Sequence, residues 1–517
     1  MLQRHHPLLR FAAAAAAGAL LSAAFAPLDQ WWLAVLCPAL LMALLEGEPP
    51  GRAAALGFWF NAGTFTAGTY WLYISVHQIG HAPLWLSFLA MGGLIGIMAL
   101  YGALLGFVAA RCLPPAGALR YLVGLPAAWV LIEWWRGWFL TGFPWLSLGY
   151  SQTDTVLRHA APVLGVYGLS ALLLVGAGAV VLLVRGSSRQ RVLAAAVLAF
   201  TWLAPWLLCR IEWTDTAGPP VRVAVAQGAI PEDEKWQEDN RQPTLDRYRD
   251  LTRQAFGAGV IVWPEAAAPD LAEDLQDYLL GLYHEAHAHG SALVLGILRE
   301  TPEGDYYNSI LAMGEEVAWY DKRHLVPFAE VFPVPGFVAN WLRLLDLPYS
   351  GFRRGAARQA PLHAGGLILA PTICYDDAYG SDDLGELATA TALVTVTNDG
   401  WFGRSSARYQ HLQIARMRAI ETRRYLIRAA NDGISAVIGP DGQVLAQAPS
   451  YSPQVLRAEV TPRVGLPPYA HTGNWLIILT AAASFSGAAV RARHGTPGGA
   501  VRSIGLSWLN LISRSRQ

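Results

Sequence analysis

The sequence predicts a polytopic α-helical membrane domain of eight spans that carries an extracytoplasmic α/β domain. Long apolar runs fill residues 1–210 and return at 474–490, short β-rich runs alternate with polar helical stretches between them, and arginines gather on one side of the apolar runs. The composition agrees, because 53% of the 517 residues are hydrophobic and 15% are charged, against about 25% charged residues in soluble proteins.

The apolar runs have the length that a bilayer crossing needs, which is about 20 residues. The run at 31–45 is the shortest of them. The first run is predicted to be a span and not a cleaved signal peptide, because further spans follow it and no cleavage site precedes a soluble domain. The predicted spans are 8–26, 31–45, 53–76, 84–110, 119–135, 161–184, 192–209 and 474–490.

The arginines predict the orientation, since basic residues concentrate in cytoplasmic segments. The short breaks on one side of the spans contain only Arg136 and Arg158. The opposite side holds thirteen, namely Arg4, Arg10, Arg52, Arg111, Arg120, Arg185, Arg189, Arg191, Arg491, Arg493, Arg502, Arg514 and Arg516. Both termini are therefore predicted to be cytoplasmic. The predicted domains are a seven-helix membrane domain, an extracytoplasmic domain, and an eighth helix with a cytoplasmic tail, at residues 1–210, 211–473 and 474–517.

The segment 211–473 has the pattern of a layered α/β domain with a mostly buried sheet. Its predicted helices are 241–256, 270–289 and 407–424. Its predicted strands are 221–227, 260–263, 293–297, 367–374, 393–397 and 434–438. The 38 basic and 38 acidic residues of the chain balance, so charge does not indicate a nucleic-acid partner.

Reactive side chains follow three of the apolar stretches. Glu265 ends the segment VIVWPE, Lys322 and Glu330 bound the segment KRHLVPFAE, and Cys374 lies in the segment ICYD. Loops at strand ends are where α/β folds hold catalytic groups. The chain has only two lysines, which indicates that an ammonium is needed at position 322. The other, Lys235, is predicted on a solvated face because acidic residues surround it.

These segments resemble the Glu, Lys and Cys signatures of the nitrilase superfamily. The whole chain resembles the membrane branch of that superfamily, the apolipoprotein N-acyltransferases. Further similar segments follow in order, namely QGAIP (227–231), TNDGWFG (397–403), QHLQIARMRAIE (410–421) and GISAVIGP (433–440). The resemblance implies an αββα sandwich for the extracytoplasmic domain.

The resemblance implies a catalytic triad of Glu265, Lys322 and Cys374, with Glu330 in support. A free thiol, with a pKa of about 8.5, is mostly protonated at neutral pH and needs a base, which would be Glu265. Lys322 would favour the thiolate and stabilise the oxyanion of the tetrahedral intermediate. Its compact ammonium with three donors suits that pocket better than a planar guanidinium.

Substrate contacts are implied at five further positions, namely Trp236, Asn308, Tyr375, Asp376 and Trp401. For the aromatic residues among them, a core or interfacial role is an equal alternative. Asp376 departs from the family, which commonly has Glu at this place. The apolar segment 326–352 is either core or an arm that dips into the lipid interface.

The implied reaction moves an acyl chain from a phospholipid to the α-amine of the diacylglyceryl-cysteine that begins an apolipoprotein. The chain would pass through a thioester on Cys374, with phosphatidylethanolamine as the implied donor and without a metal or organic cofactor. The implied location is the bacterial inner membrane, with the catalytic domain in the periplasm.

Two alternatives stay open. The same triad would serve a membrane-bound nitrilase-like amidase that passes the acyl group to water, although eight spans favour lipid substrates. A catalytically inactive lipoprotein-binding protein is disfavoured by the complete Glu-Lys-Cys set.

Overall fold

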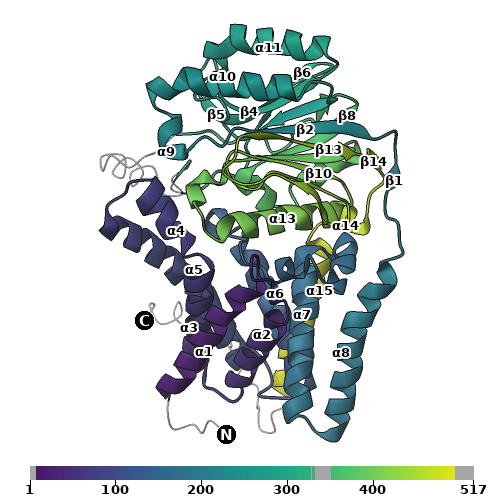
Figure 1. Cartoon of the computed structure of the whole chain (residues 1–517). Helices are drawn as coiled ribbons and strands as arrows, with labels where there is room; N and C mark the ends of the chain where they lie inside the picture. The colour runs from purple at the N-terminus through teal and green to yellow at the C-terminus, as the bar shows by residue number, and fades with distance from the viewer. Residues whose placement is uncertain (1–6, 328, 332–350, 495–517) are drawn as a thin grey trace, which may run out of the picture.

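The computed structural model of this chain describes residues 7–327, 329–331 and 351–494. It has a helical part and a strand-rich part, and the strand-rich part is stacked on one end of the helical bundle (Figure 1). Most of the segment 326–352, which the sequence predicts to be core or an arm, lies outside the described residues.

Each predicted span overlaps a helix of the bundle. Five segments are long and apolar enough to cross a membrane, by length and composition, namely Pro7–Ala24, Leu84–Cys112, Val156–Arg185, Ser188–Leu208 and Trp475–His494. The bundle helices are α1 (Pro7–Leu21), α2 (Leu33–Leu44), α3 (Pro50–Gly68), α5 (Leu84–Cys112), α6 (Leu125–Arg136), α7 (Ala161–Arg185), α8 (Ser188–Leu208) and α15 (Trp475–His494). Two predicted spans differ most from a regular membrane-crossing helix. One forms the short α2, and the other is the span at 119–135, of which α6 forms only the second part.

Three of the arginines that the sequence assigns to one side meet at one end of the bundle. Arg10, Arg120 and Arg185 all bond to the turn 43–48 between α2 and α3. Arg10 and Arg185 form ion pairs with glutamates of the turn, and Arg120 donates to one of its main-chain carbonyls at 3.1 Å. This end lies opposite the strand-rich part (Figure 1).

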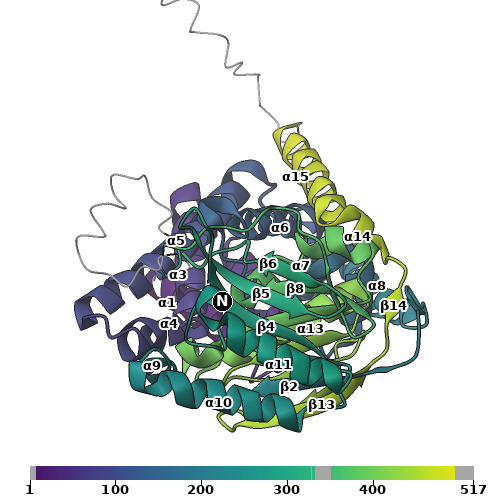
Figure 2. The same cartoon turned by 90° about the horizontal axis from the view of Figure 1, so that it is seen from above.

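The strand-rich part is a sandwich of two six-stranded sheets. The strand order is β13-β2-β3-β4-β5-β6 in the first sheet and β12-β11-β10-β9-β8-β7 in the second. The first contains β13 (Gln454–Val460), β2 (Val221–Gln227), β3 (Val260–Trp263), β4 (Ala292–Glu300), β5 (Tyr306–Met313) and β6 (Val317–Asp321). The second contains β12 (Val444–Gln447), β11 (Ala436–Ile438), β10 (Leu426–Ala430), β9 (Ala392–Thr397), β8 (Leu367–Ile373) and β7 (Leu362–Ala364). Seen from above, the strands lie across the end of the bundle (Figure 2).

Both faces of each sheet are covered, which explains the continuous apolar runs of the strands. In β3, Val260 and Val262 pack against the partner sheet. The alternate residues Ile261 and Trp263 pack against the helices α10 (Glu238–Gln254) and α11 (Gln276–Ala288). Helix α13 (Ala407–Thr422) covers the outer face of the second sheet. The αββα layering expected from the family resemblance is confirmed.

Helix α13 also joins the sandwich to the bundle, because it lies between them (Figure 1). Gln410 donates to the carbonyl that ends α3 at 3.2 Å, and Gln413 accepts from the main-chain N–H of Ala26 at 3.2 Å. Glu421 accepts from a main-chain N–H in α7 at 2.7 Å. The spacing of these residues brings them to one side of the helix, so the segment QHLQIARMRAIE forms the joint between the two parts.

Candidate active site

The predicted triad comes from strand ends in both sheets. Glu265 lies two residues after β3, Lys322 directly follows β6, and Cys374 directly follows β8. Asn308 lies within β5, next to β6. Because β3, β5 and β6 belong to the first sheet and β8 to the second, the site forms where the two sheets face each other.

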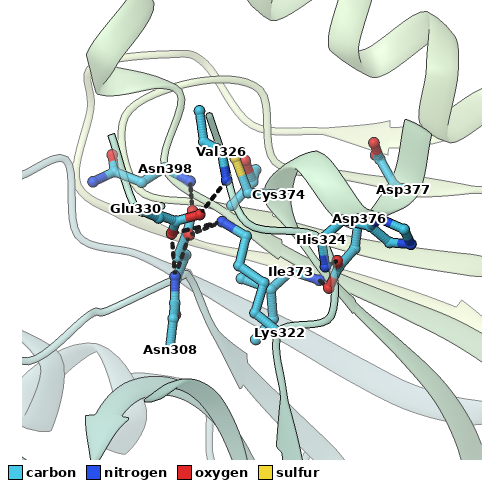
Figure 3. Close-up of polar contacts among 12 residues, drawn as sticks. Asn308, Lys322, His324, Val326, Glu330, Ile373, Cys374, Asp376, Asp377 and Asn398 are labelled. Atoms are coloured by element: carbon cyan, nitrogen blue, oxygen red, sulfur yellow. Dashed lines mark hydrogen bonds and ion pairs between the residues drawn. The ribbon is translucent and has the colours of Figure 1, made fainter. Parts of the chain in front are cut away.

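The ammonium of Lys322 is held between two carboxylates. Its Nζ lies 2.9 Å from Oε1 of Glu330 and 3.3 Å from Oε1 of Glu265. The Nδ2 of Asn308 donates to the same two oxygens, at 2.7 Å to Glu265 and 3.3 Å to Glu330 (Figure 3). Asn308 therefore fixes both glutamates around the lysine, which is a positioning role within the site.

Lys322 stays charged at neutral pH. Its side chain is 1% exposed, and burial alone would lower its pKa, but the charges of Glu265 and Glu330 outweigh burial and raise the pKa well above its ordinary value. A buried ammonium with fixed partners is a preorganised charge that can stabilise a developing oxyanion. The need for a cation at this position thus follows from the two carboxylates.

Glu265 is held on its second oxygen as well. The main-chain N–H of Asn398 donates to Oε2 of Glu265 at 2.9 Å. Gly296 of β4 makes this turn possible, because a Cβ there would lie 2.4 Å from the carbonyl oxygen of Pro264 and 2.6 Å from the Cα of Glu265. The carboxylate is therefore oriented from three directions before any substrate arrives.

Cys374 is partly exposed and occupies a left-handed backbone conformation, with a φ of +51°. Burial raises the pKa of its thiol well above the ordinary value, and the charge of Glu265 raises it further. Lys322 and a hydrogen bond with Thr397 offset this only in part. The thiol is thus neutral at rest, and a base is needed when it attacks.

Tyr375 and Asp376 hold the cysteine turn in place. The hydroxyl of Tyr375 donates to the carbonyl of Gly142, in the loop after α6, at 3.0 Å. Asp376 accepts from the main-chain N–H of His324 at 2.6 Å (Figure 3). It also accepts from the hydroxyl of Tyr320 at 3.1 Å. Tyr375 therefore links the turn to the bundle, and Asp376 links it to the loop of Lys322.

The two tryptophans that the resemblance singled out lie at the margin of the site. Trp236 is half-exposed and donates through Nε1 to Glu232 at 3.2 Å, and the side-chain amide of Asn398 donates to the same glutamate. Trp236 is thereby connected to Glu265 through two side chains. Trp401 is also partly exposed and follows Asn398 in the same loop.

The predicted surface position of Lys235 is wrong, because its side chain is 1% exposed. In the short helix α9 (Glu232–Lys235), Glu232 and Lys235 are buried while Asp233 and Glu234 are exposed. Residues three apart share one helix face, so Lys235 turns inward although acids precede it. Its ammonium lies 5.4 Å from the ring centre of Trp236.

Several residues of the site were not predicted individually. Asn398, Asp399 and His411 lie in the segments TNDGWFG and QHLQIARMRAIE, which the sequence marks as similar to the family without assigning roles. Asp377 follows the segment ICYD directly. In residues 7–327, 329–331 and 351–494, no group of three or more His, Cys, Asp or Glu side chains is arranged to hold a metal ion.

Comparison with known proteins extends over both parts of the chain. Residues 17–179 match the family model of the apolipoprotein N-acyltransferase N-terminal domain, and residues 222–466 match that of carbon-nitrogen hydrolase. An apolipoprotein N-acyltransferase of Methylococcus capsulatus is 39% identical over 463 residues, covering 89% of this chain and 91% of the relative. One of Chromobacterium violaceum is 40% identical over 477 residues, covering 91% and 92%.

A third relative, the apolipoprotein N-acyltransferase of Vibrio vulnificus, is 38% identical over 494 residues, covering 93% of this chain and 97% of the relative. The similarity thus includes the helical bundle, the sandwich and the order in which they occur along the chain. By this similarity the chain belongs to the apolipoprotein N-acyltransferase family.

Proposed function

We propose that this protein transfers an acyl chain from a membrane phospholipid to the N-terminal α-amine of a diacylglyceryl-cysteine lipoprotein, through a thioester on Cys374. The observation that carries the proposal is the buried Lys322, bonded to Glu265 and Glu330 beside the thiol. The relatives are named apolipoprotein N-acyltransferases, which supports lipoproteins as acceptors. Phosphatidylethanolamine is the donor that the family resemblance implies.

In the first half-reaction the sulfur of Cys374 attacks the ester carbonyl of the phospholipid. Glu265 takes the thiol proton, and Lys322 stabilises the negative charge that develops on the carbonyl oxygen. The ester C–O bond then breaks, and Glu265 returns the proton to the departing lysophospholipid oxygen. A thioester and a lysophospholipid result.

In the second half-reaction the free α-amine of the lipoprotein attacks the thioester carbonyl. Lys322 again stabilises the oxyanion, while Glu265 takes a proton from the attacking amine. The C–S bond breaks as the amide forms, and the proton passes to the sulfur. The free thiol is restored, and no oxidant, reductant or cofactor enters the balance.

The position of the cysteine turn supports lipid substrates. Tyr375 and Tyr379, which follow the nucleophile, donate to the carbonyls of Gly142 and Thr141 in the loop after α6, at 3.0 and 2.9 Å. The nucleophile therefore lies against the bundle. Moving an acyl chain from the bilayer into water costs about 0.8 kcal/mol for each methylene that becomes exposed. A site at the border between the sandwich and the bundle would let the lipid react without leaving the membrane.

The proposed topology has eight crossings, both termini in the cytoplasm and the sandwich in the periplasm of the bacterial inner membrane. The contacts of Arg10, Arg120 and Arg185 with the turn 43–48 support a common side for these arginines. Helix α13 contacts the C-terminal end of α3 and the N-terminal end of α7, and both ends lie away from these arginines. These contacts support helices that run the full depth of the bundle.

Labelling with a membrane-impermeant maleimide tests this topology. In a chain with Cys112, Cys209 and Cys374 replaced by alanine, so that the remaining Cys37 is buried, the exposed loop variant Glu303→Cys should react in spheroplasts with intact membranes. Arg189→Cys, at the start of α8, should react only after the membrane is opened. The reverse pattern would place the sandwich in the cytoplasm and exclude the proposed orientation.

Intact-mass analysis of purified full-length protein tests the reaction itself. Incubation with phosphatidylethanolamine vesicles should add the mass of one acyl chain, and a diacylated lipopeptide should then remove it and gain that mass. Discharge at the same rate with and without the lipopeptide would show that water is the acceptor, and the amidase alternative would hold.

A further inference from the structure

A buried cluster of four charged side chains lies behind the cysteine turn. Asp377 follows the nucleophile in the turn, Asp399 begins the short helix η10 (Asp399–Phe402), His411 lies on α13 and Arg428 lies on β10. Each is at most 1% exposed. We call these residues the charge cluster, and the proposed reaction assigns no role to any of the four.

The contacts within the charge cluster converge on His411. Its Nδ1 lies 2.9 Å from Asp399, and its Nε2 lies 3.1 Å from Asp377 and 3.2 Å from the main-chain carbonyl oxygen of Cys374. Arg428 lies 3.0 Å from the second oxygen of Asp399 and 3.5 Å from Asp377. His411 thus connects the cluster to the main chain of the nucleophile.

His411 carries a positive charge in this setting. Both of its ring nitrogens face acceptors, and imidazole donates from both nitrogens only when it is protonated. Burial and Arg428 lower its pKa, but Asp377 and Asp399 outweigh them and raise the pKa to about 9. With Arg428, it balances the two aspartates.

The conformation of Cys374 requires such support. A residue other than glycine in the left-handed region costs about 1–3 kcal/mol, and the surrounding structure must hold it there. Asp376 holds one side of the turn by accepting from the N–H of Ile373 at 3.3 Å. On the other side, His411 donates to the carbonyl of Cys374 itself.

We propose that His411 is a positioning residue for the nucleophile, which holds the Cys374 turn through its Nε2 so that the thiol points toward Lys322 and Glu265. The inference rests on the proposed function for the identity of the nucleophile. His411 is not the base in this scheme, because its Nε2 faces a main-chain carbonyl and Asp377.

Two isosteric variants test the role in the full-length protein. His411→Gln keeps an amide donor near the position of Nε2, whereas His411→Asn keeps one near Nδ1, toward Asp399. We expect His411→Gln to acylate Cys374 within about 10-fold of the wild-type single-turnover rate and His411→Asn to lose about 10²-fold, the size of effect that a 1 Å misplacement can have. The rate at which iodoacetamide alkylates Cys374, measured by peptide mass spectrometry, should likewise be higher in His411→Gln than in His411→Asn.

Arg424→Met is the matched control for stability. Arg424 is a buried cation that donates to the carbonyls of Ala390 and Gly465, away from the nucleophile. Its loss should lower the unfolding temperature and leave both rates of the folded protein unchanged. Equal rates in the two His411 variants, or losses that only follow the unfolded fraction, would overturn the proposal.

The wild-type protein provides a test that needs no variant to fold. His411 faces Asp377, Asp399, Arg428 and the Cys374 carbonyl, and its protonated form is the one that donates through both nitrogens. Because its pKa is raised, His411 is protonated at neutral pH and loses this proton as the pH rises through about 9. The acylation rate should therefore fall above pH 9, but by no more than the roughly 10-fold allowed for the uncharged donor of His411→Gln, and a rate that stays flat or rises there would contradict the inference.

The alkylation rates of the two His411 variants test the positioning role of His411 separately from the proposed acyl-transfer function. Alkylation requires only a correctly placed thiol, so it tests His411 even if no phospholipid is accepted. A wild-type protein that never gains an acyl chain would overturn the proposed function alone.

Discussion

Cys374→Ala should gain no acyl mass with phospholipid and should lose lipopeptide acylation by at least about 10⁴-fold, because removing the nucleophile of a covalent mechanism removes the reaction path. The surrounding structure should be preserved, since the side chain is small and partly exposed. Intact-mass analysis after incubation with vesicles measures the adduct, and the unfolding temperature reports the fold.

Cys374→Ser is the sharper companion variant. A serine hydroxyl in the same place is a weaker nucleophile than a thiol, and we expect its acylation to be slower by at least about 10²-fold. Full turnover by this variant would show that the reaction does not proceed through residue 374. An adduct that persists in Cys374→Ala would lead to the same conclusion.

Lys322→Met should lower the acylation rate by about 10²- to 10³-fold, the cost of removing one preorganised oxyanion partner. It should also destabilise the sandwich by about 3–5 kcal/mol, because the variant leaves the carboxylates of Glu265 and Glu330 buried without their cation. Single-turnover acylation and denaturant unfolding in detergent measure the two effects separately.

The double variant Lys322→Met with Glu330→Gln distinguishes charge balance from catalysis. It leaves a single buried carboxylate, so we expect part of the stability to return while acylation stays at the level of Lys322→Met. Recovery of the rate together with the stability would mean that Lys322 serves only to keep the fold.

A layered α/β domain with reactive groups at its strand ends could be predicted from the residues, and the αββα sandwich from the resemblance to the nitrilase superfamily. All six predicted strands occur in the two sheets, because strands buried on both faces are continuous apolar runs. The other six strands of the two sheets, β5, β6, β7, β10, β12 and β13, were not predicted. In β13 the exposed and half-buried residues give a pattern of polar and apolar side chains without a continuous apolar run, so the hydrophobic signal is weak.

The roles of individual polar residues depended on the tertiary structure. Asn308 and Asp376 are expected from the resemblance to contact substrate, yet Asn308 bonds to both glutamates and Asp376 bonds to the main chain of His324. Lys235 lies among acids in the sequence but is buried, because a short helix turns it inward. Hydrogen bonds across 40 or more residues leave no periodic pattern that a sequence displays.

The sequence by itself determined that a helical membrane domain carries an α/β domain, since apolar runs and buried strands are local patterns of adjacent residues, and its motifs determined the family resemblance. Only the tertiary structure decided which charged side chains lie in contact. The balance around Lys322, and the contact of His411 with the carbonyl of Cys374, arise from segments far apart along the chain. Their energies depend on burial and on distances of about 3 Å, and packing alone sets both.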